Sequence, residues 1–194
     1  MKAQDFVSLA TELFGKTLSA YGFSMEGSKA ATSWRKLSPE VFHIIAPDTL
    51  LNGDYFDVTV TAVSPVVDPR ILRTFPDKIG VLTAKRFLGP RGVGIHQHKF
   101  NCRNEENFRR LYRTEVEPLL LSKGLPFLDG LRKVEDILPL ISNDTMRGMA
   151  LHHLGRRAEA KPLLEAAARN LAGDTSAEME PLVNRLKTIA IETT

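Results

Sequence analysis

The segment from Tyr55 to Val63 constrains the fold of this chain most strongly, because apolar side chains occupy every second position in it. Successive side chains of a β-strand point to opposite faces of a sheet, so this spacing predicts a strand with one buried face. The residues expected on the buried face are Phe56, Val58, Val60 and Ala62. The residues expected to face solvent are Asp57, Thr59 and Thr61. The strand is bounded by turn residues at Asn52-Gly53-Asp54 and by Pro65, which has no N–H for pairing.

A helix and a hairpin are predicted before this strand. In residues 5–21 the apolar side chains recur at intervals of three and four, which places them on one stripe of a helix. Gly22 can end that helix in the left-handed conformation. Residues 30–37 and 41–46 are rich in β-branched and aromatic side chains, and they flank the turn sequence Ser38-Pro39-Glu40. They predict two antiparallel strands.

The segment after the strand gives mixed signals. Asp68-Pro69 can open a short helix. Residues 79–87 fit a helix or a strand equally well, so both alternatives stay open. Residues 95–101 alternate again, which predicts another strand.

A second helix is predicted from Asn104 onward. Asparagine is a favoured N-cap residue, and two glutamates follow it directly. The apolar positions continue to Leu119, but Pro118 is expected to kink or end the helix.

Only helical patterns remain beyond Gly124. The predicted helices span residues 129–138, 145–154, 158–171 and 177–191. We therefore predict an α+β fold, in which residues 1–128 form an antiparallel sheet with helices packed on one face. A C-terminal all-helical extension follows at residues 129–194. The two helices expected on the sheet are those at residues 5–21 and 105–120.

The first 130 residues share an order of features with a known family. The order is a helix, Gly22-Phe23, a strand at Trp34-Arg35, an apolar strand at residues 42–45, a strand at Tyr55-Phe56-Asp57-Val58, and Leu125-Pro126-Phe127-Leu128. It resembles one of the uncharacterised bacterial domain-of-unknown-function families. The resemblance implies an α+β domain and brings no established activity and no catalytic residues.

Residues 145–171 carry a second, local pattern. Gly148 and Ala160 are small enough to let two helices approach closely, Gly155 can form the turn between them, and Leu164 and Ala167 occupy packing positions. This pattern resembles one tetratricopeptide unit. The resemblance implies a helical hairpin that contacts a partner protein, and the alternative is a plain capping hairpin.

The same segment departs from the tetratricopeptide pattern. Arg147 stands where the repeat usually has leucine, and the closing proline is absent. Pro162 must fall within the first turn of its helix if it is not to break that helix. The match covers one repeat, whereas binding solenoids have about three or more.

The sequence predicts a cytoplasmic protein with no membrane partner. Glu12 and Lys16 interrupt the first apolar residues, whereas a signal peptide has an uncharged core. No apolar run reaches the roughly 18 to 20 residues that span a bilayer. Cys102 is the single cysteine, so no intramolecular disulfide can form, which is typical of a reducing compartment. We expect Cys102 to be a partly buried side chain at the end of a strand.

Positive charge is concentrated in the middle of the chain. Residues 70–113 hold eleven Lys or Arg against three Asp or Glu, a net charge of +8, within a total of +3. Such a segment attracts an acidic protein surface or a phosphate backbone. The candidate partner- or anion-binding residues are Lys85, Arg86, Arg91, Arg103, Arg109, Arg110 and Arg113. The alternative is a solvated surface whose cations pair in part with carboxylates from the rest of the chain.

His96 and His98 are the candidates for metal ligands. They lie two apart on a predicted strand, so both imidazoles would project from one face. Two ligands do not make a site, and the sequence does not place His43 or Asp57 beside them as a third. We therefore assign no metal and no cofactor.

Catalytic motifs are absent from the sequence. The loop Gly89-Pro90-Arg91-Gly92-Val93-Gly94 could present N–H groups to a phosphate, but it lacks the Gly-Lys-Ser/Thr ending of a P-loop. No nucleophile elbow or zinc-protease helix is found. Catalytic groups that only folding brings together leave no such pattern, so enzyme activity stays open.

The main functional hypothesis is a non-catalytic protein-binding or accessory protein. It depends on the repeat-like hairpin and on the basic segment. The alternative is binding of nucleic acid or another polyanion through residues 70–113. Neither the identity of the partner nor the oligomeric state is indicated by the sequence.

Overall fold

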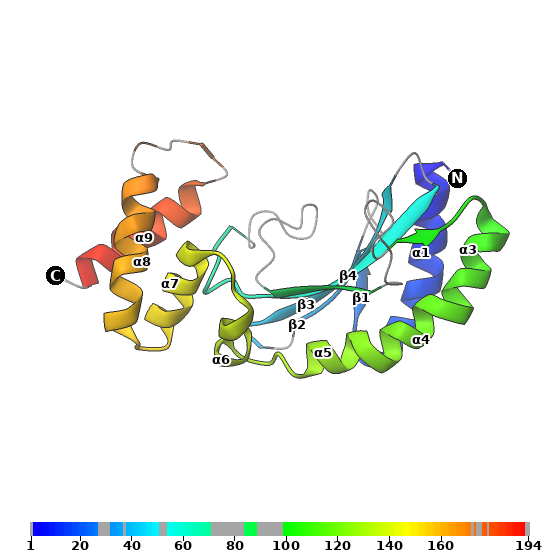
Figure 1. The fold of residues 1–194 in the computed structure, drawn as a ribbon, viewed down its shortest axis with the longest axis horizontal. Helices are drawn as coiled ribbons and strands as arrows, with labels where there is room; N and C mark the ends of the chain where they lie inside the picture. Colours follow the sequence, from blue (N-terminus) through cyan, green and yellow to red (C-terminus); the bar gives the residue numbers. More distant parts are fainter. Residues whose placement is uncertain are drawn as a thin grey trace. The chain divides into compact units, whose positions relative to one another are not determined.

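The computed structural model of this chain describes residues 2–26, 32–36, 38–50, 54–70, 84–88, 99–171, 173, 176–177 and 179–192. The chain forms two compact units, which are considered separately here. The first unit comprises Met1–Leu37, Phe42–Ala62 and Lys85–Gly130. The second comprises Ser38–Val41, Val63–Ala84 and Leu131–Thr194. Figure 1 shows the elements along the chain.

One sheet organises the strands of the described residues. They are β1 (Ser24–Glu26), β2 (Thr32–Lys36), β3 (Phe42–Leu50), β4 (Tyr55–Val63), β5 (Ala84–Leu88) and β6 (Phe100–Asn101). The strand order is β1-β2-β3-β4-β5, and β6 also pairs with β4. Pairing is antiparallel between β1 and β2, between β2 and β3, where Trp34 lies opposite Ile44, and between β4 and β6, where Phe56 lies opposite Phe100. The predicted α+β fold with an antiparallel sheet is confirmed.

Strand β4 confirms the alternation on its buried face. Phe56, Val58, Val60 and Ala62 are all fully buried. Asp57 and Thr59 on the opposite face are half-buried, but the expectation that Thr61 faces solvent is wrong, since it is 1% exposed. Every residue of β4 from Val60 onward is buried, so both faces of the strand are covered at this end.

The segments around β4 were only partly predictable. The sequence left residues 79–87 open, and the structure describes β5 as a strand at Ala84–Leu88, with residues 71–83 outside the described part. Of the strand expected at 95–101, Phe100–Asn101 is observed as the strand β6, and residues 89–98 are not among the described residues. Residues 65–67 and 69–70 form turns.

Helix α1 (Ala3–Leu18) continues as the short 3₁₀ helix η1 (Ser19–Tyr21), as the apolar spacing predicts. Gly22 follows with φ of 77°, a left-handed conformation in which a Cβ would be strained, so the predicted cap is confirmed. Helix α3 (Glu105–Leu111) begins at Asn104, whose side chain accepts a hydrogen bond from the Asn107 N–H. The predicted N-cap is therefore correct.

Of the two outcomes expected at Pro118, an end of the second helix there is wrong. The helix runs on through η4 (Tyr112–Val116), α4 (Glu117–Leu119), η5 (Leu120–Gly124) and α5 (Leu125–Asp129). Both η4 and η5 are π-helical, so hydrogen bonding shifts to i→i+5 on each side of the proline. This shift accommodates the missing N–H of Pro118 and lets the helix continue.

Aromatic side chains join the sheet to the helices of the first unit. The Phe56 ring lies 5.8 Å from Phe6 of α1, 4.9 Å from Phe108 of α3 and 5.1 Å from Phe100 of β6. Phe6 and Phe108 also contact each other, at 5.2 Å between ring centroids. Because both helices meet the same side chain of β4, they cover the same face of the sheet, as predicted.

The C-terminal region is helical, as predicted. It contains α6 (Val134–Ile137), η6 (Leu138–Leu140), α7 (Asp144–His153), α8 (Arg157–Asn170) and α9 (Glu180–Glu192). The helix expected at 129–138 is observed only as α6 and η6, over residues 134–140, since Asp129 belongs to α5 and residues 130–133 are not helical. No helix among the described residues has the length and apolar character needed to cross a membrane.

Helices α7 and α8 pack closely as a hairpin. A Cβ added to Gly148 would meet the Leu163 Cβ and the Leu164 Cδ2 at 3.0 Å each, so a larger residue here would require the neighbouring leucines to shift. The turn between the helices contains Gly155. Pro162 lies beyond the first turn of α8, contrary to expectation, and α8 nevertheless continues to Asn170.

Candidate partner-binding site

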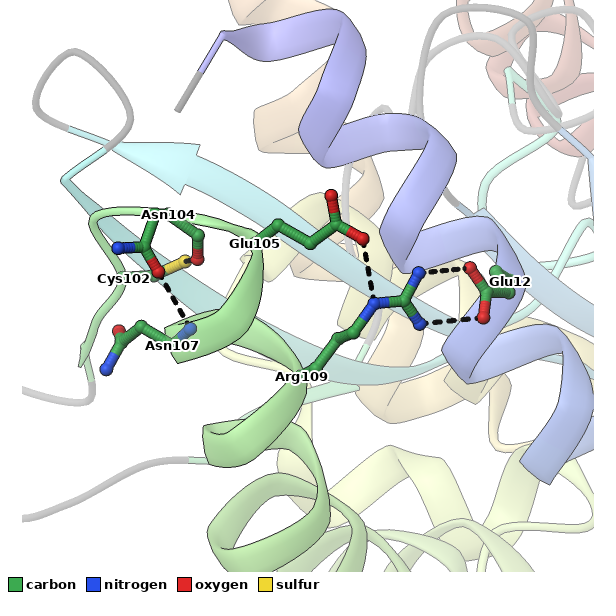
Figure 2. Close-up of polar contacts among 6 residues, drawn as sticks. All are labelled: Glu12, Cys102, Asn104, Glu105, Asn107 and Arg109. Carbon is green, nitrogen blue, oxygen red and sulfur yellow. Dashed lines mark hydrogen bonds and ion pairs between the residues drawn. The ribbon is translucent and has the colours of Figure 1, made fainter.

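The candidate site is built on the start of α3, where most of the described cations of the basic segment lie. Asn104 caps the helix, and the buried Cys102 directs its Sγ to the Asn104 carbonyl at 3.8 Å (Figure 2). Burial raises the pKa of the Cys102 thiol to about 11. A thiol of this kind is not a nucleophile at neutral pH, so Cys102 is a packing residue of the site.

Arg109 is committed to contacts inside the first unit. Its two terminal nitrogens donate to the two carboxylate oxygens of Glu12 at 2.7 Å each, and its Nε donates to Glu105 at 2.9 Å (Figure 2). The hydrogen bonds from Arg109 lower the pKa of Glu12, and those to both carboxylates raise the pKa of Arg109. Arg109 therefore joins α3 to α1, and its guanidinium is not available as a free positive charge.

Arg70 is likewise neutralised, and it belongs to the second unit. Its Nε and one terminal nitrogen donate to the Asp68 carboxylate at 2.9 Å each, and Asp68 is fully buried. The basic segment is thus divided between the two units.

Three predicted site residues are exposed near the start of the second helix. They are Arg103, Arg110 and Arg113. In the amide orientation that satisfies both of its ends, Asn107 accepts from Arg110 at 2.9 Å and donates to the Asn101 carbonyl. Residues 99–116, which run to the end of η4, hold five Lys or Arg against three Glu, a net charge of +2 that includes the paired Arg109.

The other predicted site residues are placed only in part. The backbone of Lys85 and Arg86 lies in β5. Arg91, His96 and His98 lie outside the described residues. Within the described residues there is no group of three or more His, Cys, Asp or Glu that could hold a metal ion.

No family model, no curated protein and no solved structure matches this chain. The two resemblances noted from the sequence therefore remain predictions.

Two polar networks were not predicted from the sequence, and the first is centred on Arg35. Its Nε donates to the Nδ1 of the buried His43 at 3.1 Å, and a terminal nitrogen donates to the Tyr21 carbonyl at 3.1 Å. It also pairs with Asp129 and lies 4.7 Å above the Phe23 ring. With its Nδ1 accepting a hydrogen bond, His43 cannot offer that nitrogen to a metal.

The second network runs from α1 to the π-helical turn. Tyr112 donates its hydroxyl proton to Thr17 Oγ1 at 2.8 Å, and Thr17 donates to Glu117 at 2.6 Å. Burial raises the pKa of Tyr112 to about 12. Only the helical spacing of Tyr112 pointed to its burial, and nothing in the sequence indicates the contact with Thr17.

Proposed function

We propose that this chain is a non-catalytic protein that binds an acidic partner protein through the outer surface of α3 and η4. The observation that carries the proposal is the exposure of the side chains of Arg103, Arg110 and Arg113. Complementary charge speeds encounter and orients the partner, and it adds more to specificity and association rate than to affinity.

The charged side chains in the polar networks of the first unit stabilise its fold, which supports a non-catalytic role for them. Arg35 joins two strands to η1 and α5, and Arg109 joins α1 to α3. The hydroxyl chain from Tyr112 ends on Glu117. In each network the hydrogen bonds join one element of the protein to another, so these side chains hold the helices and strands in position.

The α7–α8 hairpin gives further support for protein binding. The close approach at Gly148 and the turn at Gly155 are features that the tetratricopeptide resemblance predicts. We propose that this hairpin is a secondary protein contact. A cytoplasmic location is proposed with it, supported by the single buried cysteine.

Co-purification with charge-reversal variants tests this function. The tagged wild-type chain is used to recover a stoichiometric partner from a lysate of the native cell at about 50 mM salt. The double variant Arg110→Glu with Arg113→Glu is expected to lose that partner. The matched control reverses two exposed cations outside α3, η4 and the α7–α8 hairpin, Lys123 and Lys187, and is expected to keep it. Equal recovery with both variants would contradict the proposal.

Polyanion binding is the second candidate, favoured by the same exposed guanidinium groups. If Arg103, Arg110 and Arg113 each contact one phosphate, the logarithm of the binding constant should fall with the logarithm of salt concentration with a slope of about −2.7. A gel-shift series with duplex DNA measures that slope. No shift at about 50 mM salt removes this candidate.

A further inference from the structure

The Arg35 guanidinium connects β2 and β3 to the ends of two helical segments. Its Nε donates to the Nδ1 of His43 on β3 at 3.1 Å. Its terminal nitrogens reach the Tyr21 carbonyl at the end of η1, at 3.1 Å, and the Asp129 carboxylate at the end of α5. The centre of the guanidinium lies 4.7 Å from the centroid of the Phe23 ring. We call these five residues the Arg35 cluster, and all of them belong to the first unit.

The hydrogen bond between Arg35 and His43 fixes the protonation of the imidazole. A guanidinium keeps its protons throughout the physiological range, so Arg35 can only donate. The Nδ1 of His43 therefore carries a lone pair, and the ring is neutral with its proton on Nε2. His43 is fully buried, and the Arg35 side chain is 14% exposed. Because the two residues lie directly opposite each other in the β2–β3 pair, the strands keep their side chains together.

The charged groups around His43 do not favour an additional proton on its ring. On β2, the neighbouring strand, Arg35 presents a positive charge. From α5, Asp129 is bonded to the same guanidinium and is 48% exposed, so water screens its attraction for another cation. The charged residues on β3 itself and on the bordering elements β4 and α1 are Asp48, exposed, Asp57, half-buried, and Asp5, Glu12 and Lys16, all exposed. A proton on His43 would place a second positive charge against Arg35 inside the core.

We propose that the Arg35 cluster is an acid-sensitive switch, in which a proton taken up at His43 Nδ1 breaks the hydrogen bond with Arg35 and releases η1 and the end of α5 from the sheet. The proton comes from water and adds to the Nδ1 lone pair, so two N–H donors then face each other. Asp129 stands directly before Gly130, the last residue of the first unit. The released segment is therefore the one through which the chain leaves that unit.

The direction of the pH effect follows from the number of protons that each state binds. An unperturbed histidine side chain takes up a proton near pH 6.5. The closed cluster excludes this proton and an opened cluster accepts it, so the closed state becomes less favourable as pH falls below about 6.5. One proton changes such an equilibrium by up to tenfold per pH unit, which gives a change of about tenfold between pH 7.5 and pH 5.5.

Hydrogen–deuterium exchange of the full-length chain tests the switch. Exchange is measured by mass spectrometry at pH 7.5 and pH 5.5 and is corrected for the intrinsic pH dependence of amide exchange. Carboxyl groups ordinarily take up protons near pH 4, below this range. Peptides that cover residues 19–23 and 125–129 should lose protection by about tenfold at pH 5.5. A peptide that covers α8, residues 157–170, serves as the internal reference and should keep its protection.

The test variant is His43→Asn, because an asparagine Oδ1 can accept from Arg35 in place of Nδ1 and has no proton to gain. This variant should protect both peptides equally at the two pH values. The matched control is His153→Asn, which removes a half-buried histidine whose Nε2 lies 3.1 Å from Glu40 in the second unit. The control should lose protection as wild type does. Circular dichroism checks that both variants fold.

A measurement on the unsubstituted chain keeps the proposal testable if His43→Asn does not fold. In a chain labelled with ¹⁵N-histidine, NMR distinguishes ring nitrogens that carry a proton from those that do not. At pH 7.5 the Nδ1 of His43 should carry none, and a proton found there would overturn the switch. Unchanged protection of wild type at pH 5.5, or an equal loss in wild type and His43→Asn, would overturn it as well. These outcomes do not depend on the proposed partner protein.

Discussion

Replacing Tyr112 by phenylalanine should make the stability of this protein less sensitive to high pH. The Tyr112 ring is 2% exposed, and burial raises the pKa of its hydroxyl from about 10 to about 12. The folded state therefore holds the phenolic proton more tightly than the unfolded state does. The stabilisation is complete below pH 10, where both states are protonated, and is lost as pH rises through 12.

The size of this effect follows from the shift. A difference of about two pKa units corresponds to about 2.7 kcal/mol of unfolding free energy, which is an upper limit because solvent screens part of it. At pH 8 the substitution removes the hydrogen bond to Thr17 and should cost about 0.5 to 1.5 kcal/mol, while the ring keeps its contact with Phe14. Wild type is therefore the more stable chain at pH 8, and the difference should shrink above about pH 10 and change sign near pH 11.

Urea unfolding followed by circular dichroism, at intervals from pH 8 to pH 12, gives the unfolding free energy of wild type and of Tyr112→Phe as a function of pH. Other groups that titrate in this range affect both chains alike, so the difference between the curves isolates Tyr112. Tyr21→Phe removes an exposed hydroxyl and serves as the control, whose curve should follow that of wild type. Parallel curves for wild type and Tyr112→Phe would refute the argument that burial of this hydroxyl perturbs its titration.

Three further substitutions or treatments follow from the structure. Cys102 should react with a thiol reagent at pH 8 only after unfolding, because it is 1% exposed and its pKa is about 11; rapid reaction of the native chain would contradict this. Gly148→Val should lower the unfolding free energy by about 1 to 3 kcal/mol, because its side chain would press on Leu163 and Leu164. Thermal unfolding measures the loss, and an unchanged Tm would show that α7 and α8 can separate freely. Asp68→Ala should cost about 3 to 5 kcal/mol by leaving the Arg70 guanidinium buried without its carboxylate, and the loss in urea unfolding should persist at high salt.

Local patterns in the sequence predicted much of the fold. The alternation in Tyr55–Val63 gave a strand with the same bounds, and Asn104 gave the start of α3. Both signals arise within a few residues of the feature they predict, so no tertiary information is needed. The continuation of the helix past Pro118 was harder to predict. The two π-helical turns that carry the helix past the proline have no sequence rule as simple as capping.

The candidate site was harder to predict, because charge counts do not show pairing. Arg109 and Glu12 are 97 residues apart in the chain, and Arg35 and Asp129 are 94 apart. Neither separation matches a helical or strand repeat, so the sequence could not assign these partners. The same limit applies to Arg70, which was grouped with the cations of α3 because it is near them in sequence. Folding places it in the other unit.

The second unit is formed by segments that lie far apart in the sequence, which affects how the chain folds during synthesis and where it can be divided. Arg70 donates to Asp68 on one side and to the sulfur of Met179, 109 residues later, on the other. A ribosome must therefore have passed Met179 before this contact can close. A gene fragment that starts at Leu131 encodes α6 to α9 without the Asp68–Arg70 pair, so dividing the gene between its sheet and its last helices does not separate two self-sufficient parts.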